Sequence, residues 1–148
     1  MINHHHLILR VVTKLLVGAI ILFAFYVQFH GDFSPGGGFQ AGVLMAAAFI
    51  IYGLVFGLDK TQEVLPPWVV HKLSALGVLI YSGTGVWSMM LGYPFLDYGA
   101  FDPGHPSHGQ HTGILAVEAG VGLTVAAVMV TIYYGFGARY PHISDEDW

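Results

Sequence analysis

The 148-residue chain contains no cysteine and few charged residues. Without cysteine it has no disulfides, no thiolate catalysis and no iron–sulfur ligation. Charged residues make up 9% of the chain and hydrophobic residues 55%, whereas a soluble domain carries about 25% charged residues. Five Lys and Arg against nine Asp and Glu give no basic surface for nucleic acid. The composition therefore predicts an integral membrane protein.

The hydrophobic residues group into stretches that each approach the roughly 20 residues of a membrane-spanning helix. These stretches cover residues 9–29, 39–58, 73–91 and 113–136. A cleaved signal peptide is the competing interpretation of the first stretch, but no small-residue cleavage site follows it. The sequence therefore predicts an all-α integral membrane bundle of four transmembrane helices, in one membrane domain over residues 1–148.

The basic residues all fall on one side of these predicted helices. They are Arg10, Lys14, Lys60, Lys72 and Arg139. The other two connections, residues 30–38 and 92–112, contain no Lys or Arg. The positive-inside rule then places both termini in the cytoplasm.

Glu118 is an acidic residue inside the fourth predicted helix. An acid at mid-membrane costs roughly 2.5–3.5 kcal/mol on insertion scales, so it indicates function by default. Gly122 and Ala126 follow it at four-residue steps, which places it on a small, packed helix face near the outer side. Glu118 is therefore a candidate for the ion or proton pathway. A structural hydrogen bond to another helix is the alternative.

Lys14 is a secondary candidate, since it also lies inside a predicted helix. It is close to the inner boundary, where its side chain can reach the headgroups. A plain positive-inside anchor is the other interpretation.

The connection after the first helix is rich in glycine, with three in succession at residues 36–38. Ser34 can cap the second helix and Pro35 can open it. The glycine amides at a helix start could face an anion or a carboxylate. A tight structural turn packed under a neighbouring subunit is the favoured interpretation.

Three histidines lie in the predicted outer loop: His105, His108 and His111. Their spacing is not that of a metal site, and Pro106 and Gly109 indicate that this stretch is not a helix. A pH-sensitive or simply polar loop is favoured. A haem between His30 and His111 would need axial histidines well inside the helices. We therefore expect neither metal nor cofactor, while a stand-alone haem-binding or metal-binding four-helix protein stays as a distant alternative.

Two stretches resemble the B subunit of multisubunit Na+/H+ antiporters of the Mrp, Mnh and Pha type. The second stretch, residues 113–125, matches that family's last helix and has its acidic residue, Glu118, in place. The chain length and the four-helix layout match the family as well. The first stretch consists of His30, Gly31, Ser34, Pro35, Gly36, Gly37, Gly38, Phe39 and Gln40. Asp32 stands where many members carry a second histidine, which puts an essential histidine there in doubt, and Ala41 stands where glycine is common.

The resemblance implies a bacterial cytoplasmic-membrane subunit, without enzymatic activity of its own, in a complex that exchanges cytoplasmic Na+ or K+ for external protons. Its implied partners are large subunits resembling the pumping modules of respiratory complex I, together with other small membrane subunits. A related subunit of a membrane-bound hydrogenase-type redox complex is the nearest alternative.

Overall fold

The computed structural model describes residues 4–31 and 36–139, which are almost entirely helical. Within these ranges the elements are α1 (His4–Phe29), α2 (Gly38–Phe56), α3 (Leu58–Val64), α4 (Pro67–Met90), η1 (Tyr98–Phe101) and α5 (Pro106–Gly137). Helices α1, α2, α4 and α5 are long and apolar enough to cross a membrane. The predicted all-α bundle of four spanning helices is therefore confirmed.

Glycine and proline set the boundaries at the α3 end of the bundle. Gly57 has a left-handed φ of 94°, and its N–H donates to the Gly53 carbonyl as α2 ends. Helix α4 begins at Pro67, a position where the missing proline N–H costs nothing. The helix starts six residues before the predicted position 73, because its first turns carry polar residues that a hydropathy pattern passes over.

The expectation that Pro106 and Gly109 keep this stretch out of a helix is wrong, because α5 begins at Pro106. Proline fits the first turn of a helix. Just before it, the Asp102 Oδ1 accepts a hydrogen bond from the His105 N–H at 3.1 Å. Gly109 is the place where η1 packs on α5, since a Cβ there would lie 2.7 Å from the Tyr98 carbonyl oxygen.

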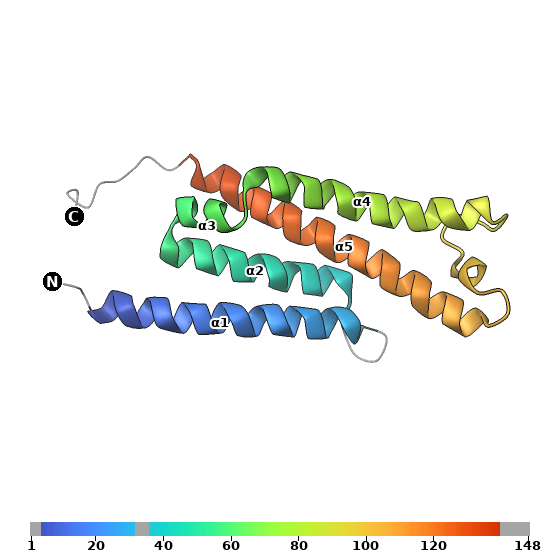
Figure 1. Cartoon of the computed structure of the whole chain (residues 1–148), viewed down its shortest axis with the longest axis horizontal. Helices are drawn as coiled ribbons and strands as arrows, with labels where there is room; N and C mark the ends of the chain where they lie inside the picture. The colour runs from blue at the N-terminus through green and yellow to red at the C-terminus, as the bar shows by residue number, and fades with distance from the viewer. Residues whose placement is uncertain (1–3, 32–35, 140–148) are drawn as a thin grey trace.

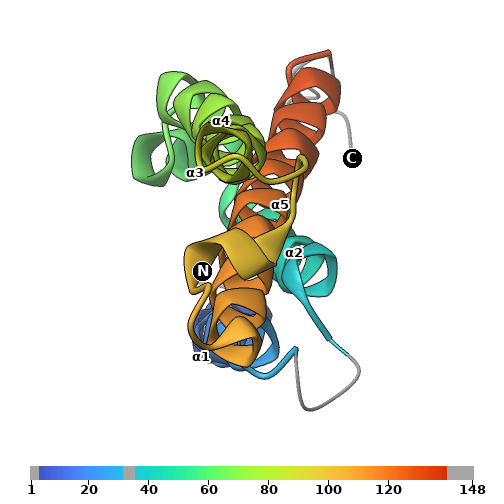
Figure 2. The ribbon, with the colours of Figure 1, turned by 90° about the vertical axis from the view of Figure 1, so that its right-hand side faces the viewer.

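The long helices run side by side, with α3 at one end and the η1 connection at the other (Figure 1). Seen from that second end, α5 lies between α4 and α1, with α2 beside it (Figure 2). Helix α5 packs against α4 and α2, and α1 packs mainly against α2. The buried core comprises Ala46, Val70, Ala127, Val130 and Tyr134.

Tyr134, in this core, connects α5 to the segment between α3 and α4 through a hydrogen bond. The Tyr134 hydroxyl donates to the Leu65 carbonyl at 2.7 Å and so gives this partly buried carbonyl a hydrogen-bond partner. The α3 end of the bundle is therefore held by a side chain that reaches 69 residues back along the chain.

The basic residues lie on the segments that meet at the α3 end, namely the start of α1, α3 itself, the start of α4 and the end of α5 (Figure 1). Here the Lys14 Nζ lies 5.6 Å from the Phe56 ring centre, and the Lys72 Nζ lies 4.8 Å from that of Trp68. Such cation–aromatic pairs suit a membrane interface.

Candidate functional site at Glu118

Glu118 lies further from the first residue of its helix than the sequence predicts. It comes 12 residues after Pro106, which is about 18 Å along the helix axis. The sequence predicts that only about a turn and a half of helix precedes Glu118, because it places the start of the last helix near residue 113. Its side chain is partly exposed, so the carboxyl is enclosed without being sealed off.

The Glu118 carboxyl group lies against glycine on two sides. A Cβ added to Gly31, just after α1, would lie 2.9 Å from Oε2. A Cβ added to Gly37, just before α2, would lie 2.9 Å from Oε1. A Cβ at either position would displace the end of the Glu118 side chain, which is flexible. The end of α1 and the start of α2 thus form a glycine cradle, defined here as Gly31, Gly37 and Gly38.

Gly38, the first residue of α2, lets this helix touch the backbone of α5. A Cβ there would fall within 2.8 Å of the Glu118 Cα and closer still to its carbonyl group. One turn further on, a Cβ on Gly42 would lie 2.5 Å from the Gly122 carbonyl oxygen. The small residues of the two helices therefore serve packing within this bundle, and they hold the Glu118 segment against the start of α2.

Gly37 has a second reason to be glycine, because its φ of 135° lies in the left-handed region. This conformation turns the chain from the α1–α2 connection into α2. The cradle therefore depends on glycine both for backbone conformation and for space.

Glu118 lies at the level where α1 ends and α2 begins. The first turn of a helix presents N–H groups without helical partners, and such groups interact favourably with acidic side chains nearby. The start of α2 is therefore a suitable neighbour for the Glu118 carboxyl group.

The remaining residues of the first predicted stretch take different positions. His30 stacks on Tyr26, with ring centres 4.2 Å apart. Gly36 packs near Val27, while Phe39 and Gln40 are exposed. Asp32, Ser34 and Pro35 lie outside the described residues, so their predicted roles stay predictions.

Lys14 and His105 lie away from the cradle. Lys14 precedes Phe29, the last residue of α1, by 15 residues, which corresponds to about 22 Å along the helix axis. His105 lies 3.7 Å from the Asp102 carboxylate, on the exposed surface beyond η1. Across residues 4–31 and 36–139, no three His, Asp or Glu side chains are grouped as metal ligands.

Sequence reasoning did not single out Gln28, which packs beside the cradle. Its Oε1 lies 2.8 Å from the position of a Cβ on Gly122. Its Nε2 is buried and has no hydrogen-bond partner among the described residues. The sequence feature that could have identified Gln28 is its polar amide near the end of the apolar second half of α1.

The family comparison and the similar proteins point to the same kind of protein. Residues 8–131 match a family described as "Domain related to MnhB subunit of Na+/H+ antiporter". The chain is also similar to proteins named "Putative antiporter subunit mnhB2" from Staphylococcus aureus strains Newman, JH1 and COL. Each is 36% identical over 132 residues, which cover 88% of this chain and 93% of the relative.

Proposed function

We propose that Glu118 acts in ion transport by this chain. The chain belongs to the family of MnhB-related subunits of Na+/H+ antiporters. The chain is a multi-pass membrane subunit of a multisubunit Na+/H+ antiporter. Other subunits of that complex are its partners. The membrane is the bacterial cytoplasmic membrane, with the α3 end of the bundle inside, and the subunit contributes to transport rather than to enzymatic chemistry.

Within that complex, Glu118 takes part in the proton or cation route, and the glycine cradle holds its carboxyl group in place. One observation carries this proposal: a membrane-embedded acid lies where glycines from two separate segments leave room for its two carboxyl oxygens.

The chain alone makes a poor complete pathway. Helix α5 carries a single acidic residue, Glu118. An ion route across about 30 Å of hydrocarbon needs more than one ionisable group. The family resemblance implies large partner subunits that resemble the pumping modules of respiratory complex I, and we propose that these carry the main ion channels. In this role, Glu118 completes a route that other subunits form.

Gentle detergent extraction from the native membrane, followed by mass spectrometry, tests the assignment to a complex. We expect large antiporter subunits to copurify with this chain. Deleting the chain should abolish Na+-driven proton movement in everted vesicles, and re-expression should restore it. Recovery of the chain with electron-transfer subunits, or recovery alone under conditions that keep antiporter complexes intact, would contradict the assignment.

A further inference from the structure

Gln28 and Glu118 lie on neighbouring turns of the same contact between α1 and α5. The Gln28 Oε1 lies 2.8 Å from the position of a Cβ on Gly122, which is one turn after Glu118. The Glu118 Oε2 lies 2.9 Å from the position of a Cβ on Gly31, which comes three residues after Gln28. The amide and the carboxyl group are therefore separated by roughly one helical turn, or about 5.4 Å along the helix axis.

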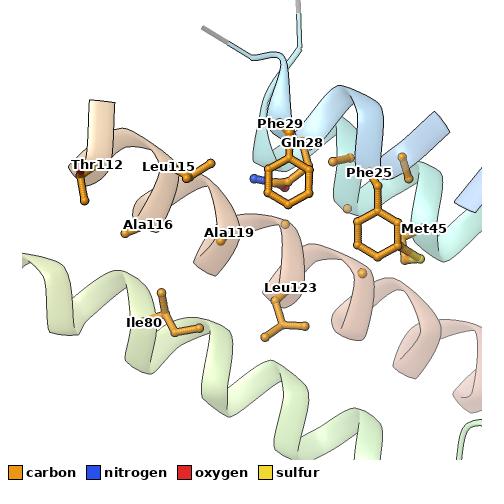
Figure 3. Close-up of a pocket in the computed structure, with 15 residues that line it drawn as sticks. Phe25, Gln28, Phe29, Met45, Ile80, Thr112, Leu115, Ala116, Ala119 and Leu123 are labelled. Carbon is orange, nitrogen blue, oxygen red and sulfur yellow. The ribbon is translucent and has the colours of Figure 1, made fainter. Parts of the chain in front are cut away.

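The amide nitrogen of Gln28 is oriented along α5 toward the level of Glu118. Figure 3 shows this nitrogen on the side of Gln28 that faces Leu115. Leu115 precedes Glu118 by three residues, whereas Gly122 follows it by four. The amide oxygen thus contacts the turn after Glu118, and the nitrogen faces back along the helix toward Glu118.

The Nε2 of Gln28 is buried and has no hydrogen-bond acceptor within the described part of the chain. A buried N–H group without an acceptor is unfavourable, because it has lost its hydrogen bonds to water. The last torsion of glutamine is broad, so the amide can turn at little cost. The donor therefore favours an oxygen that comes within its reach.

The Glu118 carboxyl group is a suitable acceptor for this donor. Its two oxygens offer about four acceptor sites, so a hydrogen bond from Gln28 can add to the contacts that Glu118 already makes. A hydrogen bond to an ionised carboxylate is shorter and stronger than one between neutral groups. A change of rotamer moves the end of the Glu118 side chain along α5, toward Gln28.

We propose that Gln28 is a positioning residue for Glu118, whose carboxyl group accepts a hydrogen bond from the Gln28 Nε2 when it leaves the glycine cradle. The inference rests on the proposed function, because it requires Glu118 to act in the ion route. The cradle and Gln28 then hold one carboxyl group in two successive positions. The second position lies closer to the α3 end, so the movement carries a bound proton or cation toward the cytoplasm.

Transport by four complexes tests the proposal: the parent, Gln28→Leu, Glu118→Gln and the variant that carries both substitutions. Gln28→Leu removes the amide while keeping a similar volume. Na+-driven proton movement would be measured in everted vesicles, with complex assembly checked in the same membranes. Gln110→Leu is the matched control and should transport like the parent, because this amide is exposed on α5 about two turns before Glu118.

We expect Gln28→Leu to slow transport at least fivefold in the parent background. In the Glu118→Gln background, which has no carboxyl group to position, it should slow transport less than twofold. Such non-additivity identifies two residues that act together. The same fold loss in both backgrounds would overturn the proposal, because the amide would then support packing alone, with Nε2 turned to the Gly38 carbonyl oxygen that also lies beside Gly122.

Two further variants keep the test decisive. Should Gln28→Leu not assemble, Gln28→Met takes its place, since methionine is an unbranched apolar side chain of similar length. Should Glu118→Gln leave no measurable transport, Glu118→Asp takes its place, since its shorter side chain keeps a carboxyl group but does not reach Gln28. The expected fold losses stay the same.

The single variants separate this inference from the proposed function. Parent-like transport by Gln28→Leu, together with slow transport by Glu118→Gln, refutes the role of Gln28 and leaves the proposed function standing. Parent-like transport by an assembled Glu118→Gln complex refutes both.

Discussion

Gly38, the first residue of α2, lies directly against the backbone of Glu118 in α5. This contact joins the two stretches that carry the family resemblance, although 80 residues separate them in the sequence. One stretch supplies the space and the other supplies the acid. The site is therefore a single packed unit and does not consist of two independent motifs.

Gly38→Ala should destabilise the bundle, because its methyl group would collide with the Glu118 backbone and push α2 away from α5. Overpacking of this kind costs about 1–3 kcal/mol. The measurement is thermal unfolding of the purified subunit in detergent. Gly83→Ala is the control, since a Cβ there meets nothing within 4 Å, and it should be neutral or stabilising by up to about 1 kcal/mol. Equal stability of the two variants would contradict the packing described here.

Tyr134→Phe should loosen the α3 end, because it removes the hydrogen bond to the partly buried Leu65 carbonyl. The expected loss is about 0.5–1.5 kcal/mol. Unfolding measurements should place Tyr52→Phe close to the parent protein, because the ring of Tyr52 keeps its stacking on Phe56 without the hydroxyl. A Tyr134→Phe protein as stable as the parent would show that the hydroxyl contact carries no weight.

The positions of the basic residues predict which end of the bundle faces the cytoplasm. A cysteine introduced at Asp59 in α3 should react with a membrane-impermeant maleimide in everted vesicles and not in intact cells. A cysteine introduced at Gly104, next to η1, should show the opposite pattern. Both positions are exposed, and the parent chain without cysteine gives the blank. The reverse labelling would overturn the orientation.

The sequence predicts the four long helices well, because twenty-residue apolar stretches have few alternatives in a membrane. It predicts their ends less well. Judged residue by residue, Pro106 and Gly109 predict a loop. In the structure, Pro106 fits the first turn of α5, and Gly109 leaves space for η1. Helix α3 is missed because seven residues with several polar side chains give no hydrophobic period.

Glu118 and the glycine stretch are each identified from the sequence, but the contact between them is not. The pattern starts the last helix near residue 113, whereas α5 starts at Pro106, about two turns earlier. Only the packing shows that Glu118 lies level with the end of α1 and the beginning of α2. Gln28 is missed because hydropathy averages over a single amide, and only packing reveals that its nitrogen lacks a partner.

The most direct test of the account is transport by the assembled complex carrying Glu118→Gln. The substitution keeps the size of the side chain and removes its charge and its proton. Na+-driven proton movement would be measured in everted vesicles, with complex assembly checked in the same membranes. Glu63→Gln in α3 is the matched control, because Glu63 is exposed outside the membrane-spanning helices.

Glu118→Gln should assemble normally and transport at least tenfold more slowly, a barrier increase of roughly 1.4 kcal/mol or more. Glu63→Gln should transport like the parent. Unchanged transport by an intact Glu118→Gln complex would contradict a role for this carboxyl group in the ion route, and the glycine cradle would then be a purely structural contact.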